Sequence, residues 1–404
     1  MDRARIRAYE VFVGIDVGKS SNYIAAFESA EDEPFLDMCV SQDEESIREA
    51  LARAASHGRT LVTVDQCGTF GRLSVAVAKG MGLDVAHVPP RKFDQIAEGY
   101  GEDKDDPVDA RIIAEVARSS PKLIGLVEGR PEVLAKVRVL ASARRDSVAE
   151  RTRCYNRLHD MINQVCPPLE KVFSKYKLRN NLEIRLLERY GGPSGLRKAG
   201  KARCAKWAAS IKYQRTHGPE KVGEIFDAIA GQTVRLPAAD AIERQIKRLA
   251  ARVVALNVEI GDLEAEIEAL SEQIPEVGVL RSIPGVGRVY GAVIAAEIGD
   301  ISRFGDSAHL AAYAGLAPVR RKSGTSVNGK RKRIGGNRQL KNALVQSADR
   351  ARGTEEWARS YYDKKRGEGK KHRQALLALA RRRVDLVYAM LSNGTYYEPR
   401  AEKA

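Results

Sequence analysis

Short apolar runs alternate with amphipathic helical patterns along the first 120 residues of the chain. Four apolar runs have the length of buried β-strands and lie at 11–15, 23–27, 61–64 and 85–88. A tight Gly-Lys-Ser turn separates the first two runs, and helical patterns at 45–55 and 73–79 lie between later ones. Strands that alternate with helices predict an α/β domain with a mostly parallel sheet.

Helical patterns dominate from residue 131 onward. Residues 131–165 and 178–187 read as helices with basic faces. The stretch 191–237 is richer in Gly and Pro and holds short helical pieces around Trp207 and Phe226. The remainder of the chain is therefore predicted to be mainly helical, and the pattern indicates no role for 191–237.

A heptad seam runs through the middle of the chain. Apolar residues recur in alternating steps of four and three at Ile242, Ile246, Leu249, Val253, Leu256, Ile260, Leu263, Ile267, Leu270 and Ile274. The seam predicts one long helix over 238–274, with Asp240 as its N-cap and Pro275 at its end. Three arrangements fit it: a helix packed in its own chain, a self-associating coiled coil, or an antiparallel hairpin with the helix at 131–165.

The segment 280–297 reads as a helix, a turn and a second helix. The turn, Ile-Pro-Gly-Val-Gly at 283–287, gives the segment a helix–hairpin–helix character. Glycine amides at a helix N-terminus suit a backbone phosphate, so Gly285 and Gly287 are candidate nucleic-acid contacts. Pro-Gly-x-Gly is also ordinary turn chemistry, and the sequence favours neither interpretation over the other.

Composition narrows the class of protein. The 404 residues include 68 Lys and Arg against 53 Asp and Glu, a net charge of +15, which favours a polyanionic partner and nucleic acid first. The length predicts two or three domains. No apolar run is long enough to span a membrane, and the first ten residues do not resemble a signal peptide. Five scattered cysteines form no CxxC pair, so we expect a reducing cytoplasm and no zinc ribbon.

Four carboxylates stand at the ends of predicted elements in the first domain. Asp16 follows the first strand, Asp65 follows the strand at 61–64, and Asp106 and Asp109 open a helix. Such residues can form an oxygen-rich pocket for two Mg²⁺ ions, or Mn²⁺ in their place, which would serve phosphoryl transfer. From these residues alone, helix capping is the favoured explanation of the last pair, with Asp106 as N-cap and Asp109 favouring the helix dipole.

A kinase interpretation of the same strand is less well supported. Gly-Ile-Asp-x-Gly at 14–18 also opens actin-like and sugar-kinase ATPases, so Asp16 alone does not separate a nuclease from a kinase. A kinase should carry further glycine-rich phosphate loops, and the sequence offers none that is convincing and no P-loop.

Positive charge is concentrated in the last quarter of the chain. Residues 319–341 contain nine basic residues and no acidic one, and 364–383 add nine basic residues against one Glu. Apolar runs flank the first cluster, which predicts that it is embedded in a folded domain and contacts nucleic-acid phosphates. The candidate contacts are Arg320, Arg321, Lys322, Lys330, Arg331, Lys332 and Arg333.

Ser323 lies inside this basic cluster and is followed by Gly324. A hydroxyl nucleophile needs a base or a metal to activate it, and cations to stabilise the phosphate that it attacks. The neighbouring residues supply the cations but no base. Spacing alone therefore favours a phosphate-contacting turn residue, unless the metal pocket of the first domain meets Ser323 across a domain or subunit boundary.

Six motifs in order resemble the insertion sequence 110 family of bacterial transposases, which are also described as bridge-RNA-guided recombinases and are related to Piv-type DNA invertases. They are GIDVGK, VTVDQCGTFG, KDDPVDARIIAEVAR, SIPGVGRVYGAVIAAEIGDISRF, HLAAYAGLAPVRRKSGTSVNG and GGNRQLKNAL. The resemblance covers 9–118 and about 280–391. Any one motif is weakly specific, whereas all six in order are highly specific.

The resemblance implies a fold and a set of domains. An α/β RNase H-like (RuvC-like) catalytic domain is expected at 9–125. A helical linker region is expected at 131–274, with a long coiled-coil helix at 238–274. A mainly α C-terminal transposase domain is expected at 278–395, carrying the helix–hairpin–helix-like segment and the Ser-Gly motif.

The resemblance also implies the site. Asp16, Asp65, Asp106 and Asp109 match the family's Mg²⁺-binding acidic tetrad, and Ser323 matches its nucleophilic serine, which forms a covalent phosphoserine link with DNA. Two positions depart from the family pattern. Asp65 stands where the family usually has Glu, and Asp105 replaces the usual Thr or Asn after Lys104.

The implied activity is RNA-guided, site-specific DNA recombination and transposition in the bacterial cytoplasm. The implied partners are donor and target DNA, a structured guide (bridge) RNA and further copies of the chain in a tetramer, joined through the coiled-coil helix. A RuvC-like Holliday-junction endonuclease, in which water attacks and Ser323 only contacts phosphate, is the alternative. A non-catalytic nucleic-acid-binding protein, with the carboxylates as helix caps, is the third hypothesis.

Overall fold

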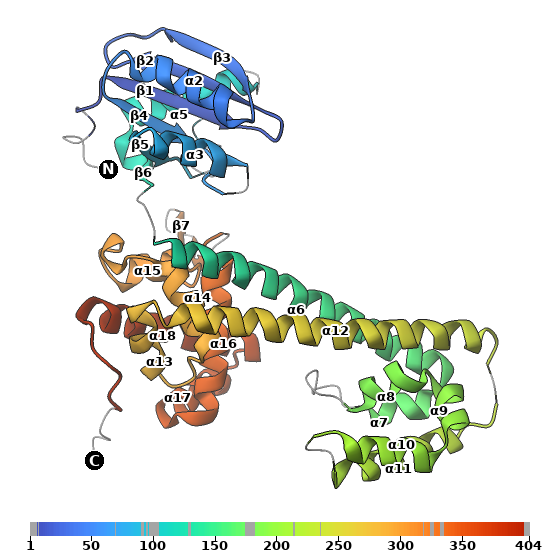
Figure 1. Ribbon diagram of the computed structural model, residues 1–404. Coiled ribbons are helices and arrows are strands. Elements are labelled where there is room, and N and C mark those ends of the chain that lie inside the picture. The colour runs from blue at the N-terminus through green and yellow to red at the C-terminus, as the bar shows by residue number, and fades with distance from the viewer. Residues whose placement is uncertain are drawn as a thin grey trace, which may run out of the picture. The chain divides into compact units, whose positions relative to one another are not determined.

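The structure is a computed structural model with two compact units, Met1–Gly129 and Arg130–Ala404 (Figure 1). It describes residues 6, 8–68, 70–89, 93, 96, 105–127, 131–173, 182–212, 215–234, 236–317, 319–323, 327–331 and 335–399. Within these ranges the description of 319–323 and 327–331 is of the backbone alone. Each unit has hydrophobic clusters of its own and is described by itself.

The first unit is built on a six-stranded sheet with the order β3-β2-β1-β4-β5-β6. The strands are β1 (Val11–Val17), β2 (Ser21–Glu28), β3 (Leu36–Ser41), β4 (Thr60–Val64), β5 (Asp84–His87) and β6 (Gly125–Leu126). Of the five pairs of neighbouring strands, only β1–β4 and β4–β5 are parallel, so the sheet is mixed and the prediction of a mostly parallel sheet is wrong. Three residues link β1 to β2, and so short a connection joins antiparallel strands only.

Helices cover both faces of this sheet. Alternate residues of β1 point to opposite faces, as in any strand. Val13 and Ile15 pack with α2 (Glu44–Ala55) and α3 (Gly71–Gly80), whereas Phe12 belongs to a cluster with Ile113 of α5 (Asp106–Ser119). The predicted helices at 45–55 and 73–79 are thereby confirmed.

The second unit contains two long antiparallel helices, α6 (Glu132–Val165) and α12 (Ala239–Ser271), which lie side by side in Figure 1. Polar pairs fix the direction: Arg144 contacts Glu264, and Arg151 contacts Asn257. The heptad seam of α12 is buried or half-buried, with Ile246, Val253, Ile260 and Ile267 at most 1% exposed. Of the three arrangements considered, the structure has the antiparallel hairpin within one chain.

The start of α12 differs from the prediction. Its N-cap is Ala238, at a φ of +55°, and no side chain caps it. Asp240 lies in the first turn instead, where it accepts a hydrogen bond from Arg244 at 2.9 Å. A negative charge in the first turn still favours the helix dipole.

A helical cluster packs around one end of this pair. It comprises α7 (Pro167–Val172), α8 (Leu182–Tyr190), α9 (Pro193–Ala199), α10 (Lys201–Ser210) and α11 (His217–Ala230). Its apolar residues, such as Leu169, Leu186 and Ile225, form one core with Ile162 of α6 and Ile246 of α12. The 191–237 stretch therefore belongs to a packed helical body.

The other end of the pair carries the C-terminal helices. They are α13 (Pro275–Ser282), α14 (Arg288–Ile298), α15 (Ser307–Tyr313), α16 (Arg338–Thr354), α17 (Glu356–Gly367) and α18 (His372–Asn393). A two-stranded hairpin, β7 (Val319–Ser323) and β8 (Val327–Arg331), lies between α15 and α16 in the chain. The hairpin was not predicted, because its residues are mostly basic and polar and show no apolar alternation.

The sequence predicts no membrane-spanning segment and no zinc ribbon. Within the described ranges, no helix combines the length and the apolarity needed to cross a lipid bilayer. All five cysteines lie in described segments and are free thiols. Cys154, Cys166 and Cys204 are buried in the helical cluster, where they pack as small apolar side chains.

Candidate active site

Asp16 and Asp65 lie at the same edge of the sheet, at the carboxyl ends of two neighbouring parallel strands. The register pairs Ile15 of β1 with Val64 of β4, so the next residue along each strand is one of these two carboxylates. The Asp65 carboxylate also accepts a hydrogen bond from the backbone N–H of Val17. The two side chains are therefore held by adjacent strands, as the sequence predicted.

Asp106 and Asp109 reach the same edge from α5. This helix packs directly on β1, because a Cβ on Gly14 would lie 2.1 Å from the carbonyl oxygen of Ala110. Near its C-terminal end, Arg118 lies over the ring of Phe27, whose strand partner Phe12 stands at the start of β1. The helix thus runs against β1, and its first turn lies towards the end of that strand, where Asp16 is.

The cap of α5 is not the predicted one. Asp105 occupies the N-cap position and makes no side-chain capping hydrogen bond, whereas Asp106 is the first helical residue. Asp106 is exposed, and Asp109 is 8% exposed. The capping explanation for Asp106 is therefore wrong.

The carboxylates do not form a closed metal site. Among the residues that the structure describes, no three His, Cys, Asp or Glu side chains lie close enough together to hold a metal ion. Asp65 nevertheless has the environment of a ligand: its Oδ1 is buried without a hydrogen-bond partner in the described part of the chain. A buried carboxylate oxygen without a donor is costly, and a bound cation would remove that cost. Asp16, Asp65, Asp106 and Asp109 carry oxygen donors of the kind that Mg²⁺ prefers.

Burial raises the pKa of the Asp65 carboxyl, although hydrogen bonds from Val17 and Gln66 oppose the shift. Burial, together with the charge of Asp65, also raises the pKa of the nearby Cys67 thiol to about 11. The thiol is therefore protonated at neutral pH in the metal-free protein.

His87 is a neighbour of the site that the sequence reasoning missed. It ends β5, the parallel strand next to β4, and its Nε2 donates to the backbone carbonyl oxygen of Asp65 at 3.0 Å. Burial lowers the pKa of His87, so the ring is neutral at pH 7. Its position at the end of the next parallel strand was the available signal. His87 fixes the backbone that carries Asp65.

Ser323 is the last residue of β7, and the strand register places it opposite Val327. The same register pairs Arg320 with Lys330 and Val319 with Arg331. The predicted contacts of Arg320, Arg321, Lys322, Lys330 and Arg331 therefore stand on the two strands of one hairpin, and their side chains lie outside the description. Gly324, Lys332 and Arg333 lie outside the described residues.

The base of this hairpin is tightly clamped. Gly336 has a φ of +102°, and a Cβ there would lie 2.6 Å from the Cα of Gly315, so the two ends of the hairpin segment cross in close contact. Asn337 then caps α16 and donates to the buried carboxylate of Glu297 at 2.6 Å. Lys341 donates to the carbonyl oxygen of Gly315 at 3.0 Å. These contacts explain the Gly-Gly-Asn motif structurally.

Gly285 and Gly287 lie in the turn between α13 and α14, as predicted. Gly285 has a φ of +82°, and a Cβ there would lie 2.5 Å from the carbonyl oxygen of Ser347 in α16. Arg383, 1% exposed, donates to the carbonyl of Pro284 in the same turn. Packing against α16 therefore accounts for glycine at 285, and nucleic-acid contact by either glycine stays a prediction.

Both units match families of known proteins. A family model described as "Transposase" matches residues 13–167, and one described as "Transposase IS116/IS110/IS902 family" matches residues 277–363. The chain is 39% identical to the 43.6 kDa protein of insertion element IS110 from Streptomyces coelicolor, over 96% of each chain. It is 34% identical to the 44.8 kDa protein of IS116 from Streptomyces clavuligerus, over 96% of each. It is 35% identical to the 42 kDa protein of IS900 from Mycobacterium paratuberculosis, over 97% of this chain and 98% of that one.

These matches agree with the fold. The first unit, with its mixed sheet, is an RNase H-like domain of the DEDD nuclease type. The second is mainly helical and contains a long helix. Since the relatives match over almost their whole length, the chain belongs to the IS110 family of transposases, enzymes of transposition and DNA recombination.

Proposed function

We propose that this transposase exchanges DNA strands at specific sites through a covalent phosphoserine link to Ser323, in a reaction that depends on Mg²⁺. The proposal is carried by two features of one chain: carboxylates at one edge of an RNase H-like sheet, and a basic hairpin whose first strand ends on Ser323. Carboxylates hold the cations that phosphoryl transfer needs, and the hydroxyl supplies the nucleophile.

In the proposed reaction, Oγ of Ser323 attacks the scissile phosphorus. A P–O bond to serine forms while the bond to the leaving oxygen of the DNA breaks; the serine proton is released and the departing strand end is protonated to a hydroxyl. A hydroxyl of the incoming strand then attacks the phosphoserine, which restores a phosphodiester and frees Ser323. One ester replaces another, so no external energy source is required. Arg320, Arg321 and Lys322 would stabilise the negative charge that develops on the phosphate.

Asp16, Asp65, Asp106 and Asp109 are the residues that we propose to hold Mg²⁺ or Mn²⁺. When bound, such an ion supplies Lewis-acid stabilisation of the attacking and leaving oxygens. The buried Oδ1 of Asp65 supports this role, since it makes no hydrogen bond to the described residues. The reaction requires Ser323 and these carboxylates to meet at one phosphate, within a chain or between two subunits.

The proposal includes a guide RNA, supported by the family resemblance and by the net charge of +15, and a tetramer, supported by the family resemblance. It also includes a RuvC-like domain at 9–125, a helical region at 131–274, a Ser-Gly domain at 278–395, and action in the bacterial cytoplasm. The seam of α12 is already buried against α6. A coiled coil between subunits would therefore use the opposite, exposed face of α12, where Val258 is 61% exposed.

Trapping of protein–DNA adducts tests the proposal. Full-length protein incubated with end-labelled DNA, guide RNA and Mg²⁺ should give a labelled protein band after denaturing electrophoresis. Ser323→Ala and Asp16→Ala should each abolish that band and recombination, while binding of DNA and RNA survives. Ser326→Ala, three residues along the same segment, is the matched control and should retain the band.

Two outcomes would contradict the serine mechanism. Full recombination by the Ser323→Ala protein would remove the nucleophile role. Cleavage of DNA with no adduct under any condition would instead favour the RuvC-like Holliday-junction endonuclease, in which water attacks and Ser323 only contacts phosphate.

A further inference from the structure

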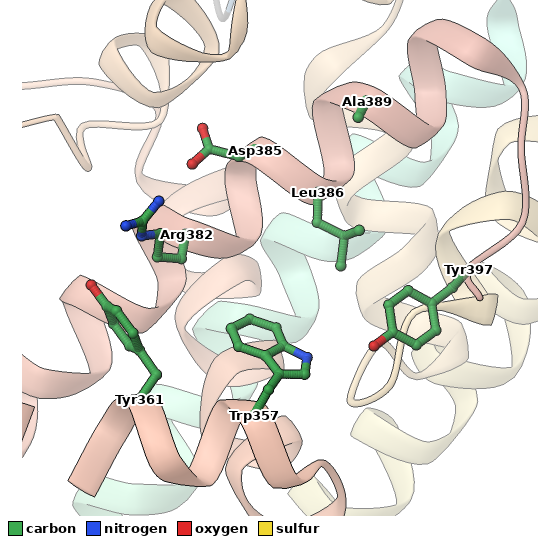
Figure 2. Close-up of a pocket in the computed structure, with 7 residues that line it drawn as sticks. All are labelled: Trp357, Tyr361, Arg382, Asp385, Leu386, Ala389 and Tyr397. Carbon is green, nitrogen blue, oxygen red and sulfur yellow. The ribbon is translucent and has the colours of Figure 1, made fainter. Parts of the chain in front are cut away.

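A pocket of about 450 Å³ opens between α17, α18 and the segment that follows α18 (Figure 2). None of its residues belongs to the candidate active site. Figure 2 shows three aromatic rings along one side, with charged groups opposite. The residues on which the argument depends are Trp357, Tyr361, Tyr397, Arg382, Asp385 and Leu386.

Two of the rings are fixed by a partly buried polar network. The indole N–H of Trp357 donates to the hydroxyl oxygen of Tyr397, and that hydroxyl donates to Glu355. Glu355 in turn pairs with the buried Arg383 at 3.4 Å. The rings are therefore held in place before any ligand arrives, which lowers the entropic cost of binding.

Asp385 provides a hydrogen-bond acceptor in the pocket. Its Oδ1 accepts hydrogen bonds from Arg381 at 2.6 Å and from Ser307 at 2.7 Å, whereas Oδ2 accepts none from the described residues. Burial opposes ionisation, but these hydrogen bonds and the charges of Arg381 and Arg382 hold the pKa of Asp385 below its usual value. The carboxylate is therefore ionised at neutral pH, with one oxygen available to a ligand.

The positive charge around the pocket is only partly neutralised. The guanidinium of Arg382 is exposed and lies 5.9 Å from the centre of the Tyr361 ring, and no ion pair of Arg382 occurs in the described part of the chain. Glu368 is the one acidic residue in 364–383, and it forms ion pairs with both Lys365 and Lys370. Lys364 and Arg373 are exposed without an acidic partner among the described residues. A polyanion would be attracted to this part of the surface of α17 and α18.

We propose that this pocket binds an unstacked nucleobase of a single-stranded nucleic acid. The aromatic rings and Leu386 would contact the faces of the base, Oδ2 of Asp385 would accept a hydrogen bond from a base N–H, and Arg382 would pair with a phosphate. A base in a duplex cannot enter, because its faces are stacked and its edge is paired. The guide RNA and a displaced DNA strand offer the same chemistry. The inference rests on the proposed function only in taking nucleic acid as ligand, and not on Ser323.

Fluorescence of Trp357 gives a direct test. The chain has two tryptophans, so the full-length Trp207→Phe protein leaves Trp357 as the only one. Titration with a mixed-sequence single-stranded RNA or DNA hexanucleotide should quench its emission, and a duplex of the same sequence should not. The tighter of the two single strands identifies the source of the base. Failure of both single strands to quench would overturn the proposal.

Substitutions at the rings sharpen this test. Tyr361→Ala should weaken single-strand binding by about 5- to 150-fold, the usual effect of losing one stacking ring, and Tyr361→Phe should not. Tyr396→Ala is the matched control, because Tyr396 is 64% exposed beside Tyr397 and does not line the pocket. Equal affinities of Tyr361→Ala and Tyr396→Ala would overturn the proposal.

Quenching measured with the Ser323→Ala protein separates this inference from the proposed mechanism. Ser323 is remote from the stacking residues in the chain and contributes nothing to the pocket. We therefore expect unchanged quenching in a protein that no longer forms an adduct. Loss of quenching in that variant would contradict an independent base-binding pocket, whereas failure of the serine mechanism in wild type would leave the binding intact.

Discussion

Asp65 illustrates how one side chain can destabilise the folded protein while it supplies a group to the candidate active site. Burial raises the pKa of its carboxyl above the value of an unfolded chain. A carboxyl of this kind destabilises the folded protein at neutral pH, and the penalty disappears as the pH falls through the raised pKa. This loss of stability is expected for a buried carboxylate that binds a metal ion, when the metal ion is absent.

Asp65→Asn should therefore raise the melting temperature of the metal-free protein at pH 7 while abolishing strand cleavage. The amide keeps the shape of the side chain but removes the buried charge. Thermal unfolding in EDTA at several pH values measures the effect, and the advantage of the variant should shrink as the pH is lowered. Asp43→Asn is the control of opposite sign, because hydrogen bonds from Ser46 lower the pKa of this exposed N-cap. Stabilisation by both variants, or by neither, would contradict this account of Asp65.

The heptad seam, by contrast, shows what the sequence predicts well at the scale of an element. Apolar periodicity alone predicts the long helix to within a few residues, because a helix that buries one stripe needs that stripe in its sequence. The partner of the stripe was left open, since nothing in a heptad distinguishes α6 of the same chain from a second subunit. Polar pairs such as Arg144 with Glu264, far apart in sequence, decide it in the fold.

Two other elements were not predictable from local patterns. Strands β7 and β8, which form the hairpin that ends its first strand on Ser323, are mostly basic. They are held at their base by the close contact of Gly315 with Gly336, which is a long-range contact. The positions of Asp16 and Asp65 followed from strand ends, whereas the contact of Asp65 with His87 depends on the neighbouring strand β5. Tertiary packing therefore determines the part of the site that the sequence leaves open.

Ile260→Ala should lower the free energy of unfolding by about 2–5 kcal/mol, because it empties a fully packed position between α6 and α12. Val139→Ala, at an exposed position of α6 where the side chain is 54% exposed, should change it by less than about 0.5 kcal/mol. Urea unfolding followed by circular dichroism measures both. Similar effects of the two substitutions would show that the seam is not buried in solution.

At the scale of the whole molecule, the division into two units with separate cores has thermodynamic consequences. Cooperative unfolding as a single transition is a property of single domains, and chains with separate cores commonly depart from it. A ligand that binds one unit stabilises that unit first. The acidic residues at the sheet edge all belong to Met1–Gly129.

Calorimetry of the full chain should therefore show two transitions, and Mg²⁺ should raise only one of them. Saturating the site at 100 times its dissociation constant would stabilise that unit by about 2.7 kcal/mol. Asp16→Ala should remove the Mg²⁺ effect while leaving the second transition unchanged. An equal shift of both transitions by Mg²⁺ would contradict a metal site confined to the first unit.

The α6–α12 pair also determines the distance between the helical cluster α7–α11 and the C-terminal helices. Ile246 lies in the core of the helical cluster α7–α11, and Ile267 lies in the core of the C-terminal helices. At 1.5 Å per residue along one straight helix, these two anchor points are about 30 Å apart. That separation corresponds to about nine base pairs of duplex, close to one helical turn. A duplex lying along α6 and α12 would therefore present nearly the same face to the helical cluster as to the C-terminal helices.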